Sequence, residues 1–372
     1  MKTFFNQAAP IIIFPVLLLA AATSPFSCGC SSGKDGGVFR SDNFGTSWTQ
    51  KVKISDKDSI NGINVLSLAI DPVSPDTLYL GSAGEGLYRS TDSAETWKQI
   101  EDKNKVLSPK ADIQDIEIDP GNPNIIYLAA FQDKFGRVFR SRDNAQTWEQ
   151  VYLVSKEKIA VLSIEIDKVN NNIIFVGTAE GGIIKSADQG ANWQQLHWFN
   201  DSVSDIKSDP KNDQIVYLAT ATKGIYRTAD QGRNWQLLSQ ATSTSGLFNP
   251  YQSQFTGFNS QTDGKIKAFT INPQDSKILY FGSEKGLFVS YNSGQNWQRM
   301  NILIPEKSIP IFTVAQDQKN PNIIYYGAGS IVYRTNDNGQ TWSVNQISSS
   351  RKVQLIKIDP ADSNIIYAGM HN

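Results

Sequence analysis

An octet that ends in tryptophan recurs seven times along this chain of 372 residues, and it constrains the fold more than any other feature. Each copy begins with Ser or Thr, has Asp or Asn at its third position and Gly or Ala at its fifth, and closes with Trp. Successive closing Trp residues are 42 to 62 residues apart, the length of one four-stranded propeller blade. The copies are SDNFGTSW (41–48), STDSAETW (90–97), SRDNAQTW (141–148), SADQGANW (186–193), TADQGRNW (228–235), SYNSGQNW (290–297) and TNDNGQTW (335–342).

The residues between two octets form a regular series of strands and turns, as residues 161–193 show. In VLSIEI, apolar and polar residues alternate as in a strand, and an Asp/Asn-rich turn follows. IIFVGT is rich in β-branched residues and ends at a Gly-rich turn, and GIIKS forms a third strand that leads into the octet. The Trp then opens a fourth strand. Four strands in each of seven units predict an all-β chain that folds as a single seven-bladed β-propeller.

The two ends of the chain hold complementary parts of one repeat. The last nine residues, NIIYAGMHN (364–372), match the first half of the longer unit NIIYYGAGSIVYRTNDNGQTW (322–342). The missing half is found at the other end, in GGVFRSDNFGTSW (36–48). The sequence therefore predicts a ring that closes by pairing N- and C-terminal strands in one blade, which leaves no open sheet edge.

The octet resembles the Asp-box, or bacterial neuraminidase repeat. With the preceding pattern IDP…NIIY.G…G.YRS, it makes the chain similar to the seven-bladed photosystem II assembly-factor propellers, and to sortilin-type and xyloglucanase-type propellers. The resemblance covers residues 36–372 and implies that the box is structural and lies opposite the binding or active site. It therefore predicts the fold and leaves the function open. The box residues are Gly45, Trp48, Asp92, Trp97, Asp143, Trp148, Asp188, Gly190, Trp193, Asp230, Gly232, Trp235, Gly294, Trp297, Asp337, Gly339 and Trp342.

The octet has the chemistry of a hairpin turn. Its Asp accepts hydrogen bonds from backbone N–H groups, its Gly takes the positive φ that closes the turn, and its Trp covers the hairpin. Four boxes depart from this pattern, and we expect strained or looser turns at Ala94, Ala145, Asn43 and Asn292. A cation precedes six boxes in register, which indicates a scaffold role against an aromatic neighbour: Arg40, Arg89, Arg140, Lys185, Arg227 and Arg334.

The opposite face of the propeller, formed by the second-to-third and fourth-to-first connections, is the expected place for recognition. We call it the loop face. A long insertion (239–265) and two shorter departures from the repeat supply aromatic side chains there, which suit a sugar or an extended peptide. Packing of the insertion on itself is an equal alternative. The candidate binding residues are Phe131, Phe135, His197, Trp198, Phe199, Phe248, Tyr251, Phe255 and Phe258.

Composition narrows the classes of partner. The 35 Lys and Arg nearly balance the 36 Asp and Glu, so no field attracts nucleic acid. Two His and two Cys are too few for the usual four-ligand zinc site. We therefore expect no metal, no cofactor and no nucleic acid, and a monomer.

The first 30 residues have the pattern of an export signal. Lys2 precedes the apolar run AAPIIIFPVLLLAAA (8–22), which is short for a membrane-spanning helix. Cys28 and Cys30 each follow a small residue, which favours lipidation of one of them, a tether over 31–35 and the propeller over 36–372. The expected location is a membrane-anchored lipoprotein facing the periplasm or cell exterior. Simple cleavage near Ala22 and secretion is the alternative, because the residues before Cys28 fit a lipobox poorly.

The favoured function is a non-enzymatic binding propeller for a protein or glycan partner, and the resemblance makes membrane-protein assembly its most concrete form. The alternative is an Asp-box glycoside hydrolase, xyloglucanase-like or sialidase-like. Such an enzyme needs two carboxylates across a sugar. The loop acids available for it are Asp133, Glu180, Asp201, Asp205 and Asp263, and no sequence pattern pairs them, so we assign no catalytic residue.

Overall fold

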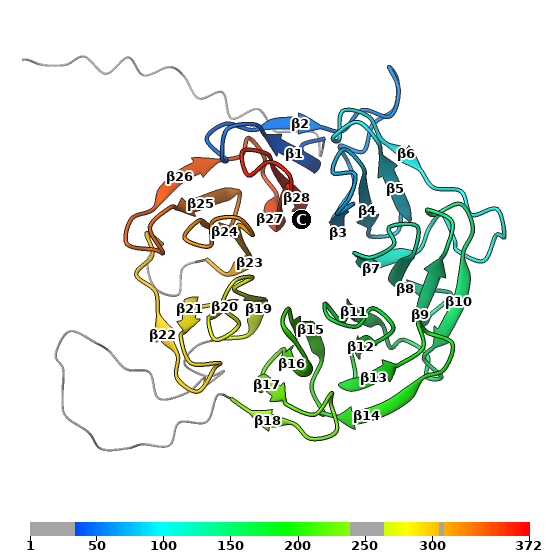
Figure 1. Ribbon diagram of the computed structural model, residues 1–372. Coiled ribbons are helices and arrows are strands. Elements are labelled where there is room, and N and C mark those ends of the chain that lie inside the picture. Colours follow the sequence, from blue (N-terminus) through cyan, green and yellow to red (C-terminus); the bar gives the residue numbers. More distant parts are fainter. Residues whose placement is uncertain (1–33, 239–263, 305–308) are drawn as a thin grey trace, which may run out of the picture. The chain divides into compact units, whose positions relative to one another are not determined.

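The computed structural model describes residues 34–238, 264–304 and 309–372, which form 28 β-strands in seven four-stranded antiparallel sheets. Figure 1 shows the sheets as blades of a ring, and residues of the innermost strands line cavities at its centre, which we call the central channel. The predicted all-β, seven-bladed propeller is confirmed. The described residues contain no helix that is long and apolar enough to cross a membrane.

Each blade has its first strand at the channel and its fourth strand at the outside of the ring (Figure 1). Blades 1 to 3 are β27 (Lys352–Ile358), β28 (Ile366–His371), β1 (Gly37–Ser41), β2 (Thr49–Lys51); β3 (Val65–Ile70), β4 (Leu78–Ser82), β5 (Leu87–Ser90), β6 (Lys98–Gln99); and β7 (Asp112–Ile118), β8 (Ile126–Gln132), β9 (Phe135–Ser141), β10 (Glu149–Leu153).

The other four blades follow in chain order, again from the channel outward. Blades 4 and 5 are β11 (Val161–Ile166), β12 (Ile174–Thr178), β13 (Gly182–Ser186), β14 (Gln194–Trp198); and β15 (Val203–Asp209), β16 (Asn212–Thr220), β17 (Gly224–Thr228), β18 (Gln236–Leu237). Blades 6 and 7 are β19 (Ile266–Ile271), β20 (Leu279–Ser283), β21 (Gly286–Ser290), β22 (Gln298–Arg299); and β23 (Ile311–Gln316), β24 (Ile324–Ala328), β25 (Ile331–Thr335), β26 (Ser343–Gln346).

The hydrophobic core is divided between the blades. Seven clusters of buried side chains are present, and each joins two neighbouring blades. The second strands, which are rich in β-branched and aromatic residues, are buried along their whole length and contribute to these clusters on both faces. Each blade therefore buries its apolar side chains against its neighbours in the ring.

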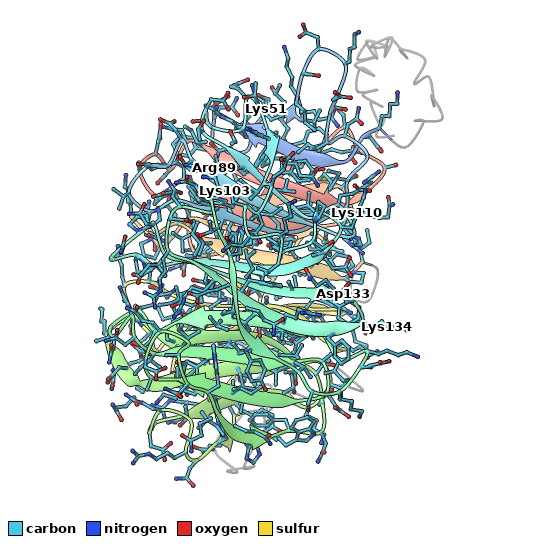
Figure 2. All side chains as sticks on the ribbon, turned by 90° about the vertical axis from the view of Figure 1, so that its right-hand side faces the viewer. Lys51, Arg89, Lys103, Lys110, Asp133 and Lys134 are labelled. Atoms are coloured by element: carbon cyan, nitrogen blue, oxygen red, sulfur yellow. The ribbon has the colours of Figure 1, made fainter. Side chains whose placement is uncertain are left out.

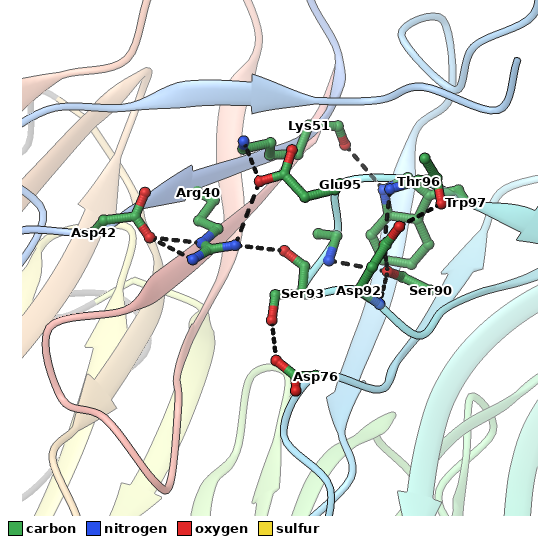
Figure 3. A network of polar contacts seen from close by, with 11 residues as sticks. Arg40, Asp42, Lys51, Asp76, Ser90, Asp92, Ser93, Glu95, Thr96 and Trp97 are labelled. Carbon is green, nitrogen blue, oxygen red and sulfur yellow. Dashed lines mark hydrogen bonds and ion pairs between the residues drawn. The ribbon is translucent and has the colours of Figure 1, made fainter.

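The Asp-box of blade 2 shows the predicted turn chemistry (Figure 3). Asp92 Oδ1 accepts hydrogen bonds from the Thr96 N–H (2.8 Å) and the Ser90 hydroxyl (2.8 Å), and its Oδ2 accepts one from the Thr96 hydroxyl (2.6 Å). Although burial opposes it, this set of donors holds the Asp92 pKa below its usual value. Trp97 is 2% exposed and donates its indole N–H to the Lys51 carbonyl of blade 1.

The four altered boxes behave in two ways. Ala94 and Ala145 adopt φ of +70° and +64°, so these alanines carry the strain that Gly would avoid, as expected. Asn43 and Asn292 instead keep the main hydrogen bond of the box. The Oδ1 atom of each accepts the backbone N–H of the residue four positions later, at 2.9 Å. These two turns are therefore not looser at that bond.

The ring closes as the sequence predicts. All five residues of β1 pair with β28, from Gly37 opposite Met370 to Ser41 opposite Ile366. On the Asp-box face, the Tyr325 hydroxyl of blade 7 donates to the Phe44 carbonyl of blade 1 (3.3 Å). The closing blade is thus held by its own sheet and by its neighbour.

The cations that precede the boxes are confirmed as scaffold. Arg89 lies over Tyr79 (5.5 Å), Lys185 over Phe175 (5.6 Å) and Arg227 over Tyr217 (5.9 Å), in each case a ring on the second strand of the same blade. In Figure 3, Arg40 reaches the box of the next blade and donates to the Ser93 carbonyl (3.0 Å). These cations therefore bridge strands and blades.

Candidate functional site

Backbone hydrogen bonds show which connections share a face. In every blade, the residue before the Gly or Ala of the box donates its N–H to a carbonyl in the turn before the second strand or, in blade 5, at the start of that strand. Examples are Ser93 to Asp76 (2.8 Å) and Gln189 to Asn172 (2.9 Å). The Asp-boxes and these turns therefore lie together. Figure 2 shows Lys110, Asp133 and Lys134, from the other two classes of connection, along the opposite edge of the ring. That edge is the loop face.

Trp198 is the most exposed aromatic side chain on the loop face among the described residues. It ends β14 at the rim of blade 4 and is 39% exposed. Gly182 lies opposite it in the sheet, and a Cβ on Gly182 would come within 2.9 Å of the Trp198 ring. Glycine at this position therefore lets the indole lie against the backbone of β13.

The two neighbours of Trp198 point to the other side of the strand. Phe199 is 5% exposed and packs between His197 (ring centroids 4.5 Å) and Tyr226 (4.6 Å), in the cluster between blades 4 and 5. Phe199 therefore belongs to the core and offers no free ring, whereas His197 is exposed above it. Of these three predicted residues, Trp198 offers the largest exposed aromatic surface.

Phe131 and Phe135 lie on one hairpin of blade 3 and are both half-buried. The two strands of this hairpin, β8 and β9, extend to Gln132 and Phe135 and are joined by a turn of two residues, Asp133 (φ +51°) and Lys134 (φ +70°). Positive φ at both positions fits the twist of a tight hairpin. The hairpin therefore extends from the loop face as a strand pair.

Several predicted residues lie outside the described part of the chain. These are the insertion aromatics Phe248, Tyr251, Phe255 and Phe258, the acid Asp263, and the lipidation candidates Cys28 and Cys30.

The four described loop acids each have their own partner. Asp133 pairs with Arg137 (3.3 Å) and Glu180 with Lys156. Asp201 accepts the backbone N–H of Thr222 (2.7 Å) and of Lys223 (2.8 Å), and so it ties the connection from blade 4 to a turn of blade 5. Their positions fit structural roles.

Asp205 lies in the central channel with a set of charged residues that the sequence analysis missed. Asp115 and Glu117 come from β7, Glu165 from β11, and Lys207 from β15, where it pairs with Asp205 (2.8 Å). A signal was present, because the corresponding positions of the other first strands hold Ser, Ala or Thr, except for Leu355 and Lys357 of β27. Only the ring shows that these positions face one channel.

Burial controls the ionisation of this channel cluster. It raises the pKa of Glu117 to about 7, against the lowering effect of Lys168, and the neighbouring Glu165 and Asp115 raise it further. Burial also raises the Asp115 pKa, although Lys207 and the Ile164 N–H lower it. No group of three or more His, Cys, Asp or Glu suited to a metal ion occurs in residues 34–238, 264–304 and 309–372.

Comparison with known proteins shows that this chain has the same type of fold as several solved structures of low sequence identity. A family model described as Sortilin, neurotensin receptor 3 matches residues 136–244, and a comparison with curated protein sequences finds no match. The GH74 xyloglucanase from Xanthomonas campestris is 14% identical (TM-score 0.65), with 87% of this chain and 52% of that chain covered. The GH74 enzyme from Niastella koreensis is 17% identical (0.64; 82% and 51%).

One further solved structure of similar fold is covered over almost its full length. YCF48 from Cyanidioschyzon merolae is 14% identical (TM-score 0.60), with 82% of this chain and 95% of that chain covered. By contrast, the chain spans about half the length of the GH74 enzymes. With one octet in every blade and a ring closed by pairing of β1 with β28, the chain is a seven-bladed β-propeller.

Proposed function

We propose that this propeller is a non-enzymatic binding protein that holds a protein or glycan partner on its loop face. The observation that carries the proposal is Trp198, an indole 39% exposed at the rim and held against Gly182. A fixed aromatic surface loses little conformational entropy on binding, so it suits the face of a sugar ring or a peptide side chain. The Asp133–Lys134 hairpin of the neighbouring blade adds polar groups to the same face.

The loop acids support binding more than hydrolysis. A glycosidase needs an acid and a base or nucleophile on either side of the scissile bond. Asp133 and Glu180 are in ion pairs, and Asp201 caps a turn. The fold-level likeness to GH74 enzymes keeps a glycoside hydrolase as the second candidate, to be decided by assay.

The proposed setting is the cell envelope, with the propeller anchored through a lipid on Cys28 or Cys30. The resemblance to assembly-factor propellers makes support of a membrane protein the most specific version of the role. Labelling with an alkyne fatty acid in cells tests the anchor: Cys28→Ala or Cys30→Ala should abolish membrane retention of the label. Full retention in both single variants and in the double variant would contradict lipidation.

A paired substitution tests the binding surface. Trp198→Ala should weaken retention of partners, while Tyr291→Ala should not, because Tyr291 is 50% exposed but lies in an Asp-box on the opposite face. Binding is measured on immobilised polysaccharides and on cross-linked membrane-protein fractions identified by mass spectrometry. Both variants should melt close to the wild-type temperature because both side chains are exposed.

Two outcomes would count against the proposal. Equal partner retention by the Trp198→Ala and Tyr291→Ala proteins would show that the rim indole is not used. Release of reducing sugar from any polysaccharide of the panel by the purified wild-type protein would favour the hydrolase.

A further inference from the structure

The channel wall formed by blades 3 and 4 carries an excess of negative charge. Four acids, Asp115, Glu117, Glu165 and Asp205 of the adjoining blade 5, face two cations there. Lys168 lies 3.3 Å from Glu117 and 3.5 Å from Glu165, and Lys207 lies 2.8 Å from Asp205. Glu165 is 1% exposed: its Oε1 accepts the Ser208 N–H (3.0 Å) and hydroxyl (2.7 Å), while its Oε2 has no hydrogen-bond partner. The protein therefore leaves part of this negative charge uncompensated.

The wall formed by blades 6, 7 and 1 carries the opposite charge. Lys357 of β27 is exposed to the channel, and no ion pair or hydrogen bond of its ammonium occurs among the described residues. Lys352, at the loop-face end of the same strand, lies over the Phe312 ring (4.8 Å) of blade 7. Lys267 of β19 also lines the channel and is paired with Glu284 (3.3 Å). Of Lys267 and Lys357, which both line the channel, only Lys357 thus has no ion pair among the described residues.

Both walls border the same space. One cavity of about 540 Å³ is lined by Asp115, Lys267 and Lys357, and a second of about 660 Å³ by Glu117, Glu165 and Lys357. The two share Lys207, Thr270, Gln318, Lys357, Ile358 and Pro360, so they adjoin along the channel. Volumes of this size are typical of small-molecule sites.

We propose that the central channel binds a small zwitterion, a free amino acid or short peptide, with its ammonium toward Asp115 and Glu117 and its carboxylate toward Lys357. Neither a simple cation nor a simple anion satisfies both walls, because each would leave one of them unpaired. A ligand that carries both charges can pair with both walls. A short backbone separates its ammonium from its carboxylate, which suits acids on blades 3 and 4 and a lysine on blade 1. The site is separate from the Trp198 surface and does not depend on the function proposed for it.

The wall residues allow substitutions that preserve the fold. Lys357→Met removes an ammonium that has no described protein partner, and Glu117→Gln keeps the shape of the side chain. The matched control is Lys98→Met, because Lys98 is exposed on the outermost strand of blade 2, away from the channel. The melting temperature of each variant is measured first, so that a loss of binding is not mistaken for a loss of structure.

Calorimetric titration of the full-length protein with glycine, diglycine, triglycine and tetraglycine, each used alone, tests the proposal. At least one of these should bind, and its N-acetyl and C-terminal amide forms should each bind at least about tenfold more weakly, the equivalent of ~1.4 kcal/mol. Lys357→Met and Glu117→Gln should each weaken binding by a similar factor, and Lys98→Met should not.

Three results would overturn the inference. They are the absence of binding across the whole series, equal affinity for the capped and free forms of the peptide that binds, and unchanged affinity in the correctly folded Lys357→Met and Glu117→Gln proteins. Failure of the Trp198→Ala test would leave these results unaffected, so the two proposals are distinguishable.

Discussion

Removal of the last nine residues, NIIYAGMHN (364–372), should open the whole ring and not merely shorten its end. These residues include β28, which lies between β27 and β1 in the closing blade (Figure 1). The truncated protein would lose the pairing on both sides of β28 and leave β1 and β27 as unpaired edges.

The magnitude follows from burial. Ile366, Tyr367 and Met370 are fully buried, in the two clusters that join blade 1 to its neighbours. Burial of a large apolar side chain stabilises a fold by about 1.5–3 kcal/mol, so three of them represent roughly 5–9 kcal/mol. That sum is comparable to the whole unfolding free energy of a typical domain, about 5–15 kcal/mol.

Point variants separate this effect from a general effect of shortening the chain. Met370→Ala should lower the unfolding free energy by about 2–5 kcal/mol because it leaves a cavity between blades 7 and 1. His371→Ala, one residue further along, should change it by less than about 0.5 kcal/mol because that side chain is not part of the core. Urea unfolding followed by Trp fluorescence and circular dichroism measures both. A truncated protein that unfolds at the same urea concentration as the full chain would refute the reasoning.

Three further predictions concern charges and turns. The Glu117 pKa, raised from 4.5 to about 7, means that the folded protein keeps a proton that the unfolded chain loses, so this group lowers stability as pH rises through that interval. The stability of Glu117→Gln minus that of the wild type should therefore be larger at pH 8 than at pH 5, by up to about 3 kcal/mol. Melting curves in which the two proteins depend on pH in the same way would contradict this. Asp143→Ala should lower the unfolding free energy by about 1 kcal/mol, because it leaves the Thr147 N–H without its acceptor. Asp143→Asn should lower it less, because Asn43 and Asn292 accept the same bond in their boxes. Equal melting temperatures of the two variants would contradict this prediction. Arg351→Met should lower the unfolding free energy by about 2–4 kcal/mol, because Arg351 is 6% exposed and donates to the Gly62 and Ile63 carbonyls. A loss of less than about 0.5 kcal/mol in chemical denaturation would exclude this structural role.

The Asp-box is the part of this protein that its sequence describes best. The octet is a local structure, in which the acceptor, the positive-φ residue and the covering Trp all lie within eight residues. Ser90, Asp92 and Trp97 therefore have the roles that their spacing predicts. The turn strain at Ala94 and Ala145 was likewise predictable, because a positive φ is a property of one residue in one turn.

The candidate binding residues show where local reasoning ends. Trp198 and Phe199 are adjacent and both aromatic, so composition does not separate them. Alternation along β14 places Trp198 against Gly182 at the rim and Phe199 among Tyr226 and Trp235 of the next blade. Which side of the strand is covered depends on the neighbouring blade, and that contact is not encoded in the nearby sequence.

The sequence by itself determined the number of blades, the order of strands within each blade, and the closing of the ring by its two ends. These follow from repetition, because seven copies of one turn at blade-length spacing permit one architecture. Only the tertiary structure decided what the first strands enclose. Asp115, Glu165, Lys207 and Lys357 are far apart in the chain and unremarkable one by one, but ring closure places them around one channel. Their opposing charges acquire meaning only there, because Coulomb interactions depend on distance in space and on burial.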